Sequence, residues 1–239
     1  MKIAYRFLLK GGQERRFELN LDPQTLSFIP AAGEPPSEWT RLSNRQCPHC
    51  PLREDRHPQC PIARNLAGVI GEFAQSISFE EAEISIATEA REYRRRAPLQ
   101  SGISSLIGLV MVTSGCPHLD KLRPMVYTHL PFSSTEETIY RAISMYLLAQ
   151  YLRQKRGLRP DWELAGLVKV YEAISLVNKH FVERLKAVKL QDASLNAIVK
   201  LDCFAAMTST IIEAQALAGV ESLFRTYLDG PETGPACRP

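Results

Sequence analysis

Four of the six cysteines in this chain are followed directly by proline, and together they could bind one metal centre. They are Cys47, Cys50, Cys60 and Cys116. Cys47 and Cys50 form a Cys-x-x-Cys pair, a spacing that lets two sulfurs approach one metal from a tight loop. In a reducing compartment a cluster of thiols is more often a ligand set than a pair of disulfides. We therefore expect these four residues to form a single site.

Two occupants suit four thiolates, a tetrahedral zinc ion and a [4Fe–4S] cluster. A proline after each cysteine removes a backbone donor and shields the sulfur from water. In bacterial ferredoxins a Cys-Pro dipeptide marks a cluster ligand, but zinc knuckles also use Cys-Pro-x-Cys. Because closed four-cysteine zinc sites are common structural elements, we expect Zn²⁺ and keep the [4Fe–4S] cluster as the alternative. A thiol cluster without metal is a third possibility.

Three histidines flank the cysteines and are expected to surround the ligands. His49 lies between the first two cysteines, His57 follows in the same polar stretch, and His118 comes two residues after Cys116. Each could replace a cysteine as a ligand. Hydrogen bonds around the ligands tune a metal, and His49 and His118 occupy the same place in two copies of Cys-Pro-His.

Other polar residues give weaker signals. Asp120 and Arg123 follow Cys116 closely and could line a catalytic pocket, although a simple ion pair on one helix face explains them equally well. A run of arginines at 91–96 suits the solvated face of an edge strand. No nucleic-acid-binding motif accompanies that run, so nucleic acid is not the expected partner.

The elements that must position the cysteines alternate between hairpins and helices in the first half of the chain. Apolar residues recur at every second position in four segments, and Gly11-Gly12 supplies a turn between the first two. Pro61 suits the first position of a helix, and Gly115 suits the end of another. The expected strands span about 3–9, 17–21, 82–86 and 93–97, and the expected helices span about 61–73 and 99–113.

The second half has helical periodicity throughout. Ser133 or Ser134 with Glu136 or Glu137 forms a capping box, and Asp161 and Asp192 are expected to cap two long helices. The helices expected here span about 118–129, 134–155, 161–188 and 192–217. We therefore predict an α+β fold, with a hairpin-helix-hairpin-helix part at 1–115, an antiparallel helical bundle at 116–228 and a disordered tail at 229–239.

Two motifs carry a resemblance to a known family. The segments are Gln46-Cys-Pro-His-Cys-Pro-Leu52 and Ser114-Gly-Cys-Pro-His-Leu-Asp120, followed by Leu122-Arg-Pro124 and His129-Leu-Pro-Phe132. With the spacing between them, they resemble a family of bacterial proteins known only as a domain of unknown function. The resemblance implies a bacterial cytosolic setting and one site built on the four Cys-Pro positions. It implies no activity.

Length and composition set the remaining expectations. The 239 residues are 45% hydrophobic with a net charge of +3, which is ordinary for a soluble protein and too weak a charge to indicate a polyanionic partner. The N-terminus lacks the apolar core of a signal peptide, so we expect a cytoplasmic protein without a membrane segment. The predicted function is a non-catalytic regulatory or interaction module, with a homodimer or a protein partner bound through the helical half. The alternatives are an iron–sulfur protein that senses redox state or transfers electrons, and a metalloenzyme with its pocket at Cys116–Arg123.

Overall fold

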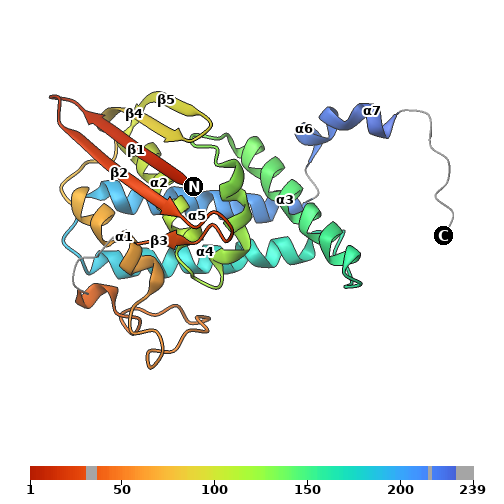
Figure 1. Cartoon of the computed structure of the whole chain (residues 1–239), viewed down its shortest axis with the longest axis horizontal. Coiled ribbons are helices and arrows are strands. Elements are labelled where there is room, and N and C mark those ends of the chain that lie inside the picture. The colour runs from red at the N-terminus through yellow and green to blue at the C-terminus, as the bar shows by residue number, and fades with distance from the viewer. Residues whose placement is uncertain (31–36, 215–216, 230–239) are drawn as a thin grey trace.

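The chain folds as an α+β protein, as predicted, with one antiparallel sheet lying against a group of helices (Figure 1). The computed structural model describes residues 1–30, 37–214 and 217–229. The tail expected to be disordered lies outside these residues except for Asp229. The strands are β1 Lys2–Leu9, β2 Glu14–Leu21, β3 Phe28–Ile29, β4 Glu81–Thr88 and β5 Glu92–Pro98.

Both predicted hairpins join one five-stranded sheet with the order β3-β2-β1-β4-β5. The central strand β1 pairs with β2 on one side and with β4 on the other. Tyr5 and Phe7 of β1 are paired with Ile86 and Ile84 of β4, and all four side chains are buried. Alternate residues thus form one apolar face. Arg94, Arg95 and Arg96 of the arginine run lie on the edge strand β5, where charged side chains protect the edge from pairing with another chain.

Helices make up most of the other residues that the structure describes. Five are long, two consist of four residues each, and the segment after Cys116 is a 3-10 helix that contains Pro124. The α-helices are α1 Pro61–Glu72, α2 Leu99–Thr113, α3 Thr135–Lys155, α4 Ala165–Lys186, α5 Asp192–Glu213, α6 Ala218–Glu221 and α7 Arg225–Leu228. The 3-10 helices are η1 Glu38–Thr40, η2 Leu119–Thr128 and η3 Ser222–Phe224.

Of the three predicted helix caps, one is confirmed in full. Ser134 caps α3, and the side chain of Glu137 accepts a hydrogen bond from the Ser134 backbone N–H in a complete capping box. The predicted start of α4 at Asp161 was wrong, because Leu164 adopts a left-handed conformation with φ of 61° and the helix begins only at Ala165. The Asp161 carboxylate still accepts from the backbone N–H of Gly166 at 2.7 Å.

Asp192 was also predicted as a cap, but it is the first residue of α5. Its carboxylate binds the backbone N–H and the hydroxyl of Ser78, both at 2.8 Å. Asp192 therefore fixes the start of α5 to the segment that precedes β4.

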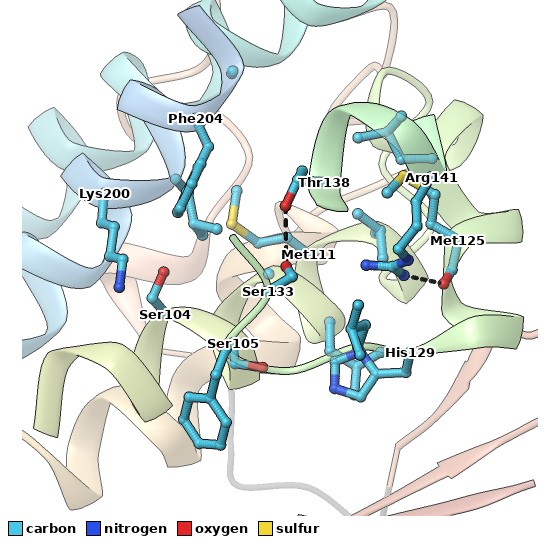
Figure 2. A pocket seen from close by; sticks show the side chains of 18 of the residues that line it. Ser104, Ser105, Met111, Met125, His129, Ser133, Thr138, Arg141, Lys200 and Phe204 are labelled. Atoms are coloured by element: carbon cyan, nitrogen blue, oxygen red, sulfur yellow. Dashed lines mark hydrogen bonds between the residues drawn. The ribbon is translucent and has the colours of Figure 1, made fainter. Parts of the chain in front are cut away.

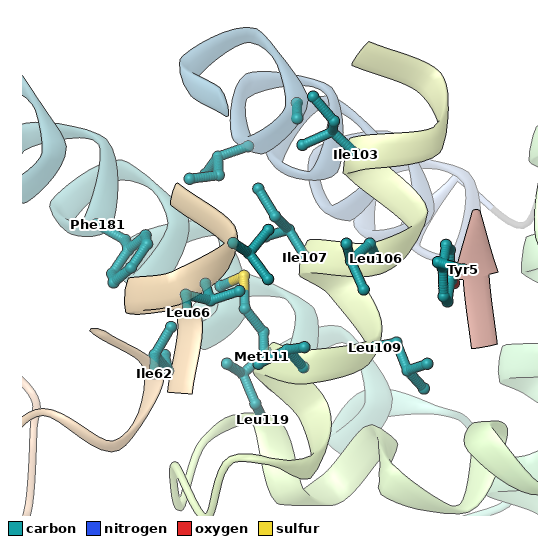
Figure 3. Close-up of a cluster of buried hydrophobic side chains, with 14 of the residues drawn as sticks. Tyr5, Ile62, Leu66, Ile103, Leu106, Ile107, Leu109, Met111, Leu119 and Phe181 are labelled. Atoms are coloured by element: carbon teal, nitrogen blue, oxygen red, sulfur yellow. The ribbon is translucent and has the colours of Figure 1, made fainter. Parts of the chain in front are cut away.

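Helix α2 lies in the middle of the core, between the sheet and the helical half. Figure 3 shows Ile103, Leu106 and Ile107 of α2 among buried side chains from β1, α1 and α4. One hydrophobic cluster includes residues of all of these elements and of α5. Helix α5 is long and apolar enough by composition to cross a membrane. Here it packs against α2 and α4.

Candidate metal centre

Three of the four Cys-Pro cysteines lie on the segment between η1 and α1, which local hydrogen bonds hold in place. The Cys50 N–H donates to the Cys47 carbonyl at 3.0 Å, which closes the Cys-x-x-Cys turn. The Cys60 N–H donates to the Thr40 carbonyl at 2.9 Å. Cys60 caps α1 and Pro61 is the first helical residue, as predicted from the sequence.

The fourth cysteine is placed by the end of α2. Gly115 has φ of +89°, a conformation that favours glycine, and turns the chain out of the helix. The Cys116 carbonyl then accepts from the N–H groups of Leu119 and Asp120, at 3.1 and 3.0 Å, which starts η2. The Cys116 side chain is thereby buried at the junction of α2 and η2.

These four cysteines converge on one cavity of about 20 Å³. Two places far apart in the sequence supply them, the segment before α1 and the end of α2. Helix α4 closes the opposite side with His180, Phe181 and Arg184. The structure therefore brings together all four predicted ligand residues.

Burial keeps two of these thiols protonated when no metal is bound. It raises the pKa of Cys47 to about 12, and the neighbouring Cys60, Cys116 and Cys50 add to the effect. It also raises the pKa of Cys116 to about 11. A metal binds the thiolate form, so metal binding here has to release protons and depends on pH.

Arg184 is the most important residue that the sequence did not indicate. It is 2% exposed and donates to the carbonyls of Trp39 at 2.9 Å, Arg41 at 2.6 Å and Leu42 at 3.3 Å. Its charge interacts with Cys60, Cys47 and Cys50. Arg184 thus fixes the start of the cysteine segment to α4 and places a buried cation beside the thiols.

Two of the three predicted histidines lie together near the cysteines. The rings of His49 and His118 stack with 4.0 Å between their centroids. His118 Nε2 contacts the His49 carbonyl at 2.9 Å, and His49 Nε2 contacts the Ala173 carbonyl at 3.1 Å. His118 lines the cysteine cavity, whereas His57 is exposed and does not line it.

His180 lines this cavity although its sequence position suggested no role. His180 and Arg184 are four residues apart and so share one helix face. Their spacing from the apolar Val177 is the only sequence signal that could have identified them. That signal does not distinguish a site from an ordinary helix surface.

Asp120 and Arg123 pair with each other, as the simpler interpretation of the sequence expects. The Arg123 guanidinium also donates to the Ser27 hydroxyl at 3.2 Å. Neither residue lines the cysteine cavity. In the described part of the chain, this pair joins η2 to the segment before β3.

The chain belongs to the family described as a domain of unknown function, DUF6901, which it matches over residues 3–225. The resemblance inferred from the cysteine motifs is therefore confirmed. No curated protein matches the chain. No solved structure matches it either.

Proposed function

We propose that this chain is a non-catalytic cytoplasmic metalloprotein whose four Cys-Pro cysteines hold one [4Fe–4S] cluster that senses redox state or transfers electrons. The observation that carries the proposal is the convergence of Cys47, Cys50, Cys60 and Cys116 on one cavity. Four cysteines are the common ligand set of such clusters. The buried cation of Arg184 would offset part of their negative charge.

The Cys-Pro dipeptide supports a cluster beside the zinc ion that the sequence favours, because in bacterial ferredoxins it marks a cluster ligand. Four sulfurs bound to one zinc ion lie about 2.3 Å from it and therefore about 3.8 Å from one another. In a cluster each cysteine binds a different iron, so the sulfurs are farther apart. Among the residues that the structure describes, no three His, Cys, Asp or Glu side chains are grouped so that they could hold one ion.

A structural zinc ion is the second candidate, and the size of the cavity favours it. The volume of about 20 Å³ is close to that needed for one water molecule. A cluster would require the cysteine segment to move outward. Because zinc in such a closed site keeps no open position for substrate, it would be a structural element without a redox role.

Metal analysis of protein purified without oxygen tests the proposal. We expect about four irons and as many inorganic sulfides per chain, with visible absorption that reduction bleaches. Cys116→Ser should remove most of the iron, whereas Cys203→Ser, at an exposed position outside the cavity, should leave it unchanged. One zinc per chain with no iron would contradict the cluster and support the structural zinc ion instead. Absence of both metals from protein with intact thiols would contradict both.

The homodimer expected from the sequence is also proposed. Large apolar side chains are exposed on α3, and a second copy of the chain could cover them. They are Tyr140, Leu148, Tyr151 and Leu152. Sedimentation equilibrium should give twice the chain mass of 26.8 kDa, and a monomer at micromolar concentration would contradict the proposal.

A further inference from the structure

A second and much larger cavity, of about 610 Å³, lies among α2, η2, α3, α4 and α5 (Figure 2). Its volume is within the range of small-molecule sites, about 300–1,000 Å³. It shares no lining residue with the cysteine cavity. The cavity is therefore a separate candidate binding site.

Short side chains on one face of α2 create the space. Ser101, Ser104, Ser105 and Gly108 all line the cavity, and their spacing places them on the same helix face. The opposite walls are mostly apolar and come from η2 and α5. Their largest members are Leu119, Leu122, Met125, Val126, Leu201 and Phe204. Such walls suit a ligand with a hydrocarbon body.

The charged residues around the cavity are mostly positive. Arg95, Arg141 and Lys200 line it. Glu137 is the one carboxylate among the described lining residues, and it already accepts a hydrogen bond from the Ser134 N–H at 2.7 Å. An anionic ligand would therefore enter a site with unbalanced positive charge.

Arg141 is the cation best placed to hold an anion inside the cavity. Figure 2 shows its guanidinium beside Met125 and His129, across the cavity from Lys200. One terminal nitrogen donates to the Met125 carbonyl at 2.8 Å. The Arg141 Nε–H is buried and has no partner within the described chain. A guanidinium has five donors, so this side chain can bind a further acceptor.

We propose that this cavity binds a carboxylate carried on a hydrocarbon chain, with the carboxylate on Arg141. A guanidinium and a carboxylate match in shape and form two parallel hydrogen bonds. The donors would be terminal N–H groups of the guanidinium other than the one that binds the Met125 carbonyl. The hydrocarbon chain would lie along the apolar walls of η2 and α5. The proposal goes beyond the metal centre and does not depend on it.

A phosphate head on the same kind of chain shares much of this chemistry. A phosphate dianion is bound best by several cations, but Lys200 lies on the other side of the cavity from Arg141 (Figure 2). The single half-buried guanidinium therefore favours the singly charged carboxylate.

Fluorescence titration of the full chain with dansyl-undecanoic acid tests the proposal, with the neutral methyl ester of the same probe as the ligand control. We expect the acid to bind more tightly than the ester, by about tenfold or more, because one charge-assisted hydrogen-bonded pair separates them. Unlabelled dodecanoate should displace the probe at lower concentration than dodecyl phosphate. Equal binding of acid and ester, no binding of the acid, or preferential displacement by the phosphate would each overturn the proposal.

Variants locate the site. Arg141→Met should weaken binding of the acid about tenfold or more and leave the ester unchanged, whereas Arg156→Met, at an exposed position just after the same helix, should change neither. Ser104→Leu fills the cavity from α2 and should weaken both probes, so it tests the location even if Arg141→Met does not fold. Unchanged binding in a folded Arg141→Met protein, or in Ser104→Leu, would overturn the assignment.

Discussion

Arg184 combines two roles at one residue, since it fixes the cysteine segment to α4 and places a positive charge beside the thiols. Arg184→Met leaves three backbone carbonyls without their donor. We expect the free energy of unfolding to fall by about 2–4 kcal/mol, because hydrogen bonds to a buried charged group are among the stronger ones. Urea denaturation measures this change.

The matched control for this variant is Lys179→Met, which removes an exposed cation from the same helix. If the proposed cluster is present, Arg184→Met should also lower its reduction potential, because loss of a nearby positive charge favours the more positive, oxidised state. Equal stability of the two variants would show that Arg184 does not anchor the cysteine segment.

His129 gives the fold a sensitivity to acid. Its Nε2 contacts the Tyr5 hydroxyl at 2.7 Å, and burial, with a smaller effect from Arg141, lowers the pKa of His129 to about 4. An unfolded histidine has a pKa of about 6.5. As the pH falls from about 6.5 to 4, the unfolded chain therefore takes up a proton that the folded chain does not. The free energy of unfolding should fall over this window by up to about 3 kcal/mol.

His129→Gln should remove this part of the pH dependence, because glutamine does not titrate. Urea denaturation at pH 7 and pH 4.5 compares the two proteins, with His57→Gln as a matched exposed substitution. A variant that keeps the full loss of stability between the two pH values would show that His129 is not its source.

The four ligand residues could be predicted from the sequence because the signal was local and chemical, a repeated Cys-Pro. Arg184 could not be predicted in this way. Its partners Trp39, Arg41 and Leu42 lie more than 140 residues away in the chain. Only the fold brings them to α4. The large cavity could not be predicted from the sequence for the same reason, because it depends on how small side chains of α2 face residues of η2 and α5.

At the scale of elements, the contact of α2 with the sheet is so close that one position on the helix must be glycine. A Cβ added to Gly102 would lie 2.6 Å from Phe7 Cε1 and 2.7 Å from Ile84 Cδ1. Both are buried ring or branched side chains in the core. Gly102→Ala should therefore destabilise the protein by about 1–3 kcal/mol through overpacking.

Gly68 in the exposed face of α1 is the matched control. Nothing lies within 4 Å of a Cβ added there, so Gly68→Ala should stabilise the protein by about 1 kcal/mol through helix propensity alone. The melting temperatures of the Gly102→Ala and Gly68→Ala variants should shift in opposite directions from that of the unmodified protein. A shift in the same direction would mean that the sheet can move away from α2 at little cost.

Hydrophobic periodicity predicted the strands and helices well wherever burial has a simple pattern. The alternation of Ile3, Tyr5 and Phe7 identified β1 because one face of the strand is buried and the other is only partly buried. The start of α4 was misplaced because the left-handed Leu164 has no sequence signature, unlike a glycine in that conformation. Thus the elements were predictable, and their exact ends depended on contacts made elsewhere in the fold.

At the scale of the whole molecule, α4 connects the two cavities. Tyr171, Ile174 and Asn178 line the large cavity, whereas His180 and Arg184, farther along the helix, line the cysteine cavity. The hydrophobic cluster that contains α4 extends through β1, α1, α2 and α5. Most of this core lies outside the cysteine segment, so the fold has a source of stability that is independent of any metal.

This distribution predicts how the protein responds to loss of metal. Removal of the proposed cofactor with a chelator under reducing conditions should leave the far-ultraviolet circular dichroism nearly unchanged, because the buried core remains. The segment between η1 and α1 should open locally, since its turns, the bonds to Arg184 and the contacts of His49 with His118 and Ala173 would be what still holds it. Trypsin should then cut after the exposed Arg45, Arg53 or Arg56 faster than in the metal-bound protein.

Equal cleavage rates before and after metal removal would show that the metal does not order this segment. Loss of the helical signal on chelation would show instead that the metal, and with it the junction of α1, α2 and α4, is required for the whole fold.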